Sequence, residues 1–99
     1  MQTYLLLSSL SPQGIQTLAA TPERLFEVNR EIERLGGRVV RQWALLGAYD
    51  FLSEVEAPDA LTIAKLTVEL GARGSASFET MVAIPVDEML DSLGPADPQ

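Results

Sequence analysis

The side chains that could perform chemistry in this 99-residue chain are few, because it contains neither cysteine nor histidine. Their absence excludes disulfides, thiol catalysis, histidine general-base chemistry, zinc fingers and iron held by histidine or thiolate. We therefore expect no cofactor and no metal site, and we assign no catalytic residue. The residues that are left as candidates for binding a small ligand are Arg41, Trp43, Tyr49, Asp50, Glu54 and Glu79.

Most of these candidates fall in two neighbouring segments that are predicted to be β-strands. Residues 38–46 are rich in Val, Trp and Leu, which favour strands, and residues 49–56 form a second such run. Gly47-Ala48 separates them, and a two-residue loop with Gly first is typical of a type II′ hairpin turn. The candidates therefore lie on one hairpin, with Glu79 on a later strand.

A two-residue loop also predicts which residues share a face of the sheet, because side chains alternate along each strand. The predicted cross-strand pairs on one face are Arg41–Glu54, Trp43–Leu52 and Leu45–Asp50. Those on the other face are Leu46–Tyr49, Ala44–Phe51, Gln42–Ser53 and Val40–Val55, and their small and branched side chains suit a position under helices. A shift of one residue in the loop would exchange the two faces.

The face that carries Trp43 is costly to leave in water, because it also holds two leucines and an Arg–Glu pair. An exposed apolar area of this kind usually marks an interface. We expect a second copy of the chain to cover it, with two sheets packed face to face about a two-fold axis. The predicted partner is thus the chain itself, in a homodimer or a larger homo-oligomer.

The remaining segments complete an α+β domain. Strands are predicted at residues 3–9 and 75–84 and helices at 12–18, 22–35 and 58–72, with Thr21 as the N-cap of the second helix. The long elements follow the order βαββαβ, which gives a ferredoxin-like, four-stranded antiparallel sheet with two helices on one face. We assign residues 1–86 to this domain. Residues 87–99 are expected to be a short acidic tail, partly disordered, with one weak helical turn at 87–93.

The charge of the chain restricts its partners. The net charge is −7 and the chain has seven basic residues in all, so no basic stripe is available to neutralise nucleic-acid phosphates. Binding to an anionic membrane is disfavoured for the same reason. No apolar run approaches the ~18 residues of a membrane span, and no secretory signal is visible, so we expect a cytoplasmic protein.

Several segments together resemble the GYD-domain family, over residues 3 to about 89. The segments are Leu10-Ser11-Pro12-Gln13-Gly14-Ile15, Thr21-Pro22-Glu23-Arg24, Leu35-Gly36-Gly37, Leu46-Gly47-Ala48-Tyr49-Asp50 and Val55-Glu56-Ala57-Pro58-Asp59. The signature reads Gly-Ala-Tyr-Asp here, with one residue between Gly and Tyr-Asp, and Gly-x-Tyr-Asp is common among members of the family.

The resemblance implies a dimeric α/β-barrel, because the family is similar to proteins of that type. They include cofactor-free monooxygenases, muconolactone isomerase-like enzymes and the effector-binding domains of leucine-responsive regulators. Those effector domains carry Gly-x-Tyr-Asp at the same hairpin and bind small amino acids between subunits near it. The family has no settled biochemical function, and this chain has no helix-turn-helix segment for binding DNA.

The candidate residues also have structural explanations. Gly47, Tyr49 and Asp50 suit a turn in which Tyr packs beside a helix and Asp accepts backbone N–H groups, or else a loop that holds a polar ligand at the subunit boundary. Arg41 and Glu54 form either a cross-strand pair of little net effect on stability or the polar centre of a pocket. A carboxylate of Glu79 close to Glu54 would raise the pKa of one of the two and permit acid–base chemistry.

Three functional hypotheses follow. The leading one is a non-catalytic dimeric domain that binds a small polar ligand or acts as an interaction module. The alternative is a cofactor-free monooxygenase or isomerase-like enzyme with its site inside the barrel. That chemistry usually recruits His, Asn, Trp or Arg at the pocket. Of these, His is absent and the one Asn of this chain, Asn29, is predicted to lie on a helix. The third is a purely structural oligomer.

Overall fold

The structure is a computed structural model, and it describes residues 1–94. In chain order the elements are β1 (Gln2–Leu10), α1 (Pro12–Ala20), α2 (Arg24–Arg34), β2 (Arg38–Ala44), β3 (Phe51–Ala57), α3 (Ala60–Gly71), β4 (Ala76–Ala83) and α4 (Val86–Ser92). The predicted α+β class is confirmed, and each predicted strand and helix is present. The first connection between strands contains two helices in series, α1 and α2.

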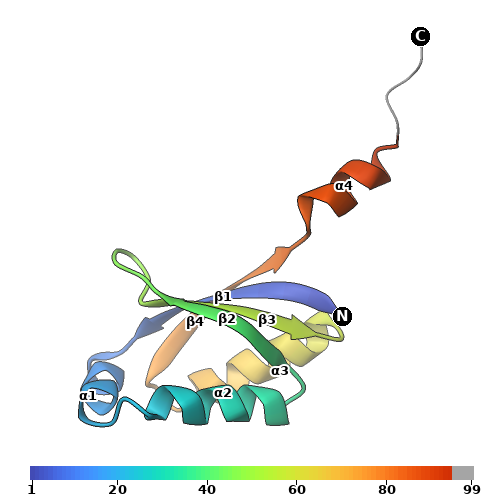
Figure 1. Cartoon of the computed structure of the whole chain (residues 1–99). Coiled ribbons are helices and arrows are strands. Elements are labelled where there is room, and N and C mark those ends of the chain that lie inside the picture. Colours follow the sequence, from blue (N-terminus) through green and yellow to red (C-terminus); the bar gives the residue numbers. More distant parts are fainter. Residues whose placement is uncertain (95–99) are drawn as a thin grey trace.

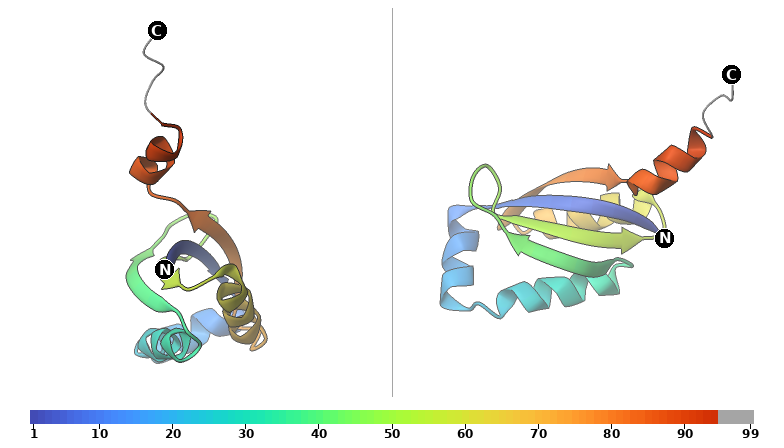
Figure 2. Two further views of the ribbon diagram at one scale, coloured as in Figure 1. Left: turned by 90° about the vertical axis from the view of Figure 1, so that its right-hand side faces the viewer. Right: turned by 45° about the horizontal axis from the view of Figure 1, so that its top comes forward.

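The four strands form one antiparallel sheet in the order β2-β3-β1-β4. Helices α1, α2 and α3 all lie against the same face of this sheet, whereas α4 stands beyond the end of β4 (Figure 1). Figure 2 shows the strands arching over the helices, so that the opposite face of the sheet is turned outward. The arrangement is compatible with the ferredoxin-like fold predicted from the sequence.

Side-chain caps explain where two of the helices begin. Ser11 accepts a hydrogen bond from the N–H of Gly14 at 3.1 Å and is the N-cap of α1, with Pro12 following it. Asp59 caps α3, because its Oδ1 accepts hydrogen bonds from the hydroxyl and the N–H of Thr62 at 2.7 and 2.9 Å. These two hydrogen bonds stabilise the carboxylate and lower the pKa of Asp59.

The start of α2 differs from the prediction. Thr21 is not the N-cap, because Glu23 occupies that position and its side chain makes no capping hydrogen bond. The N–H groups of Arg24, Leu25 and Phe26 each bond to the carbonyl three residues back, at 3.0–3.3 Å. The chain therefore makes a tight turn through Thr21-Pro22-Glu23 before the helix begins at Arg24.

The core lies between the sheet and its helices. It consists of Tyr4, Leu6, Ile32, Val55, Ala57, Ile63, Leu66 and Leu70. Alternation along β1 directs Tyr4 and Leu6 into this core and turns Leu5 and Leu7, which are half-buried, to the opposite face. The strand is thus apolar on both sides although its own chain supplies helices on only one.

The hairpin of β2 and β3 confirms most of the predicted register. Five pairs match: Arg41–Glu54, Gln42–Ser53, Trp43–Leu52 and Ala44–Phe51 are strand partners, and the N–H of Leu45 donates to the carbonyl of Asp50 at 2.8 Å. The predicted pairing of Val40 with Val55 is wrong, because Val39 takes that place and a bulge between Val39 and Arg41 leaves Val40 without a partner. The bulge lets Val39 pack against the core.

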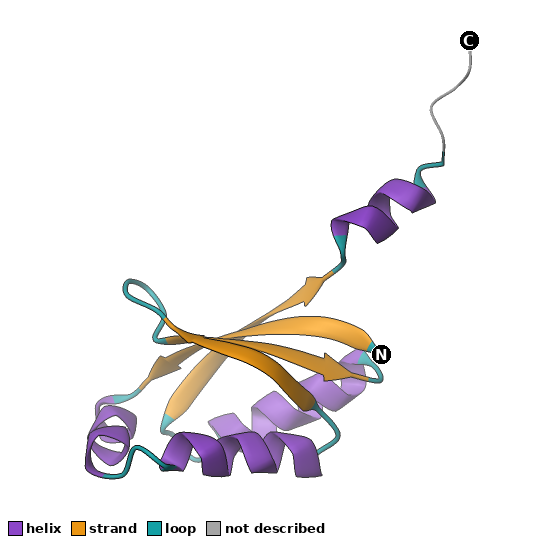
Figure 3. Ribbon diagram, in the orientation of Figure 1, coloured by secondary structure: helices purple, strands orange, loops and turns teal. Residues whose placement is uncertain are grey.

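The connection within the hairpin is longer than predicted. Strand β2 ends at Ala44 and β3 begins at Phe51, so residues 45–50 form a six-residue loop instead of a two-residue turn. Gly47 within it has φ = +130°, a conformation that favours glycine. The loop rises from the sheet on the side away from the helices (Figure 3).

Helix α4 replaces the weak turn predicted at 87–93. Its apolar side chains, Val86, Met89 and Leu90, are exposed, as is Leu93 directly after it. Residues 95–99, which belong to the tail predicted to be partly disordered, lie outside the described residues. Among the helices of residues 1–94, each is too short or too polar to cross a membrane.

Candidate functional site

The sheet has one face without a helical cover, and we call it the open sheet face. Its members are Thr3, Leu5, Leu7 and Ser9 of β1, Arg38, Arg41 and Trp43 of β2, Leu52, Glu54 and Glu56 of β3, and Ser77, Glu79, Met81 and Ala83 of β4. Trp43 keeps 43% and Met81 44% of their surface exposed. Four of the six candidate site residues, Arg41, Trp43, Glu54 and Glu79, belong to this face.

Arg41, Trp43 and Glu54 form one cluster on the open sheet face. The guanidinium of Arg41 lies 3.0 Å from Oε1 of Glu54 and 5.6 Å from the centre of the Trp43 ring. The Arg41 side chain is 67% exposed, and an exposed ion pair of this kind contributes ~0–1 kcal/mol to stability. The cluster is therefore available for contacts with another molecule at little cost in stability.

Tyr49 and Glu79 form a second cluster, on the far side of β1. The hydroxyl of Tyr49 donates a hydrogen bond to Oε2 of Glu79. That bond raises the pKa of Tyr49 above 10.0, with smaller contributions from burial and from the negative charge of Glu79. The expectation that Tyr49 packs beside a helix is wrong, because the loop 45–50 curls over the opposite side of the sheet.

Asp50 has the contacts of a structural residue. Its Oδ2 accepts a hydrogen bond from the N–H of Leu10 at 2.8 Å, and its own N–H donates to the carbonyl of Ser8 at 2.8 Å. Both bonds tie the loop to the end of β1, as the structural interpretation of this aspartate requires.

Glu54 and Glu79 are not brought together. Leu5 is the partner of Glu54 and Leu7 is the partner of Glu79, so β1 runs between the two carboxylates. Two strand spacings of ~4.8 Å separate their strands. Glu54 binds Arg41 and Glu79 binds Tyr49, and neither contact forms an acid–base pair of carboxylates. Residues 1–94 contain no cluster of acidic side chains suited to holding a metal ion.

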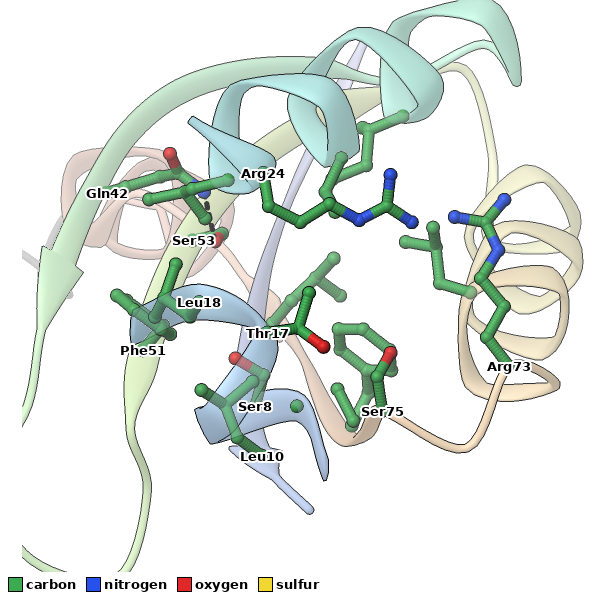
Figure 4. A pocket seen from close by; sticks show the side chains of 18 residues that line it. Ser8, Leu10, Thr17, Leu18, Arg24, Gln42, Phe51, Ser53, Arg73 and Ser75 are labelled. Atoms are coloured by element: carbon green, nitrogen blue, oxygen red, sulfur yellow. Dashed lines mark hydrogen bonds between the residues drawn. The ribbon is translucent and has the colours of Figure 1, made fainter. Parts of the chain in front are cut away.

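A cavity of about 110 Å³ lies on the other side of the sheet, between the strands and the helices (Figure 4). Apolar side chains from all three helices and the sheet line it, among them Leu6, Leu18, Leu25, Val28, Phe51 and Phe78. No candidate residue chosen from the sequence lines this cavity.

Polar groups occupy one wall of the cavity. Gln42 of β2 donates to the hydroxyl of Ser53 at 2.9 Å, and its amide pairs with the amide of Asn29 on α2 at 2.7 and 3.0 Å. Ser8 and Ser53 are each 8% exposed. The sequence already indicates these polar groups, because the predicted register pairs Gln42 with Ser53 on the face of the sheet that helices are expected to cover.

The comparison with known families identifies the chain. The model of the GYD domain matches residues 4–93. The chain belongs to the GYD-domain family. This membership confirms the resemblance inferred from the Gly-Ala-Tyr-Asp segment and its flanking motifs, and it covers nearly the whole of the described structure.

A named relative is closely similar to the chain. The chain is 48% identical over 94 residues to a protein of Thermus thermophilus called glutamine synthetase and cystathionine beta-lyase binding protein. The match spans 94% of this chain and 99% of the relative. The two proteins therefore correspond along almost their whole length.

Solved structures support the fold of this GYD protein. A crystal structure of another protein from Thermus thermophilus superposes with a TM-score of 0.55 over 86% of this chain and 95% of that one. The sequences are 20% identical, so the likeness concerns the fold alone.

The residues of the GYD signature hold the loop 45–50 in place. Gly47 supplies the positive φ of the loop, Tyr49 fastens the loop to β4 through Glu79, and Asp50 fastens it to β1 through Leu10. The three residues hold the loop 45–50 over one end of the sheet.

Proposed function

We propose that this GYD protein is a non-catalytic interaction domain, which self-associates through the open sheet face and binds other proteins as a dimer. The observation that carries the proposal is the exposure of Trp43 and Met81 on a sheet face that also holds Leu5, Leu7 and Leu52. Helices α1 to α3 all lie on the opposite face and cannot cover these side chains. A second copy of the same face is the natural cover.

The open sheet face supplies a large part of the area that a stable dimer needs. Four strands of about eight residues present roughly 26 × 19 Å, or about 500 Å² in projection. A stable interface buries about 800 Å² on each partner. Helix α4 stands beyond the end of β4 and carries exposed apolar residues, which would supply further area against a second copy.

The charged residues of the open sheet face suit this arrangement. Arg38 pairs with Glu56 at 3.0 Å and Arg41 pairs with Glu54 at 3.0 Å, so the positive charges that enter the interface are matched within each chain. In the barrel formed by two sheets, Arg41, Trp43, Glu54 and Glu79 would face the interior. A small polar ligand held between the subunits would meet these four side chains.

The name of the relative suggests that the protein partners of this chain are enzymes. Its name states that it binds glutamine synthetase and cystathionine beta-lyase, and it matches this chain almost from end to end at 48% identity. We assign the same two classes of enzyme, from the organism of this chain, as its protein partners. An enzymatic role has no comparable support, because Glu54 and Glu79 are each held by a neighbour and lie on opposite sides of β1.

Size-exclusion chromatography with the two purified enzymes tests the proposal. The chain is expected to co-elute with glutamine synthetase or with cystathionine beta-lyase, and an unrelated acidic protein of similar size is expected not to. Trp43→Glu should abolish co-elution if the dimer is the binding form, while Phe26→Glu, at an exposed position of α2, should retain it. Failure of the wild-type chain to bind either enzyme would overturn the assignment of partners.

A further inference from the structure

The cavity between the sheet and the helices has the composition of a ligand pocket. It lies on the opposite side of the sheet from the open sheet face, and α1, α2, β1, β4 and the end of α3 enclose it. Its lining is predominantly apolar, with aliphatic side chains and the rings of Phe51 and Phe78. A lining of this kind favours an apolar ligand over water.

The polar side chains on one wall of the cavity already have hydrogen-bond partners within the protein. Gln42 uses its amide to bind Asn29 and Ser53, so these groups hold α2 to the sheet. No buried side-chain polar atom of residues 1–94 is left without a hydrogen-bond partner. Moving a charged group into the inner part of the cavity is therefore unfavourable, because the group would lose its hydration and gain no hydrogen-bond partner there.

The charged residues that line the cavity are both arginines, Arg24 at the start of α2 and Arg73 after α3. Figure 4 shows their guanidinium groups near one another on the same side of the pocket. Both guanidinium groups can contact one anion on that side of the pocket, where Glu27 and Glu31 offset part of their positive charge.

Each arginine retains hydrogen-bond donors for such an anion. Arg24 binds Glu27 through Nη1 at 2.6 Å, and Arg73 binds Glu31 through Nη2. Both glutamates lie outside the lining of the cavity. A guanidinium has five N–H donors, and the other edge of each group is left to bind a carboxylate.

We infer that this pocket binds a small amphipathic carboxylate, with its apolar body in the cavity and its carboxylate between Arg24 and Arg73. The cavity of about 110 Å³ is somewhat smaller than the ~150 Å³ cavity that accepts benzene in another protein. The body is therefore no larger than a single ring or a short aliphatic chain. The inference is independent of the proposed function, because the pocket and the open sheet face lie on opposite sides of the sheet.

Titration calorimetry with phenylacetate and hexanoate tests the inference, with phenylacetamide and hexanamide as uncharged controls. At least one carboxylate is expected to bind the wild-type chain about tenfold more tightly than its amide, because hydrogen bonds to a charged group are the stronger ones. The double variant Arg24→Gln/Arg73→Gln should lose this preference. Arg30→Gln, a matched change of an exposed arginine on α2 that does not line the cavity, should keep it.

A second variant tests the location without changing charge. Thr17 is exposed on α1 and lines the cavity, so Thr17→Phe fills the pocket from its rim and should abolish binding of phenylacetate. Circular dichroism confirms that each variant is folded. The inference is overturned if neither carboxylate binds at millimolar concentration, if acids and amides bind equally, or if folded Thr17→Phe binds phenylacetate as the wild-type chain does.

Discussion

At the scale of residues, the Gly-Ala-Tyr-Asp segment shows how neighbouring side chains divide one task. Asp50 makes hydrogen bonds to the end of β1, whereas Tyr49 reaches across to Glu79 on β4. These two strands are neighbours in the sheet, so the loop is fastened at two adjacent points. The segment thus holds the loop against two neighbouring strands.

The contact between Tyr49 and Glu79 leads to a prediction about titration. Replacing Glu79 by Gln removes the carboxylate that holds the Tyr49 proton, so the pKa of Tyr49 should fall toward 10.0. NMR of the chain with ¹³C-labelled tyrosine, recorded between pH 8 and about 12, follows Tyr49 separately from Tyr4.

The raised pKa of Tyr49 in the wild-type chain determines how the stability depends on pH. The hydrogen bond contributes stability below pH 10.0, and that contribution is lost as the pH rises through the raised pKa. Glu54→Gln is the matched control, since Glu54 binds Arg41 and not Tyr49. An unchanged pKa of Tyr49 in Glu79→Gln would contradict the hydrogen bond.

At the scale of elements, close packing of α1 depends on one glycine. A Cβ atom built on Gly14 would meet the carbonyl oxygen of Ser75 at 2.2 Å. The same stretch of chain is held by a hydrogen bond from the N–H of Ser11 to that carbonyl at 2.9 Å. Helix α1 therefore lies directly against the segment that joins α3 to β4, and both line the cavity.

Gly14→Ala is accordingly expected to destabilise the fold, by about 1–3 kcal/mol, because backbone must move to admit the methyl group. Gly71→Ala is the matched control. Its Cβ would meet its nearest neighbour at 3.9 Å, and alanine at a helical position is favoured over glycine by up to ~1 kcal/mol. Urea denaturation measures both, and equal stability of the two variants would contradict the observed position of α1.

The sequence predicts the hairpin better than the loop that joins its strands. Pairing from Trp43–Leu52 to Arg41–Glu54 follows from a turn centred on Gly47-Ala48, and alternation then places the apolar residues on the correct faces. The bulge at Val40 and the length of the loop were missed, because they depend on contacts with other elements. Asp50 binds β1, Tyr49 binds β4, and none of these partners is adjacent in the sequence.

The helix-side cavity was missed for a similar reason. Arg24 and Arg73 lie far apart in the sequence, and only the packing of α2 and α3 on one face of the sheet brings them to the same pocket. Gln42 opposite Ser53 was the available signal, since two polar residues on a face that helices cover require partners.

At the scale of the whole molecule, the central claim is that the open sheet face is an interface between copies of the chain. Three helices cover one side of the sheet, and the other side exposes Trp43 and Met81. The net charge of −7 limits unspecific association, and the proposed self-association uses this apolar surface. Replacing Trp43 by Glu puts a charge on the edge strand β2 of the proposed interface, beside Leu52 of β3.

Sedimentation velocity of the wild-type chain, Trp43→Glu and Phe26→Glu tests this claim most directly. Phe26 is 61% exposed on α2, so its replacement by Glu changes the charge equally on the helical side. The wild-type chain and Phe26→Glu should sediment as a dimer or a larger oligomer, and Trp43→Glu as a folded monomer. A wild-type chain that sediments as a monomer at every concentration, or a Trp43→Glu variant that stays associated, would contradict the account.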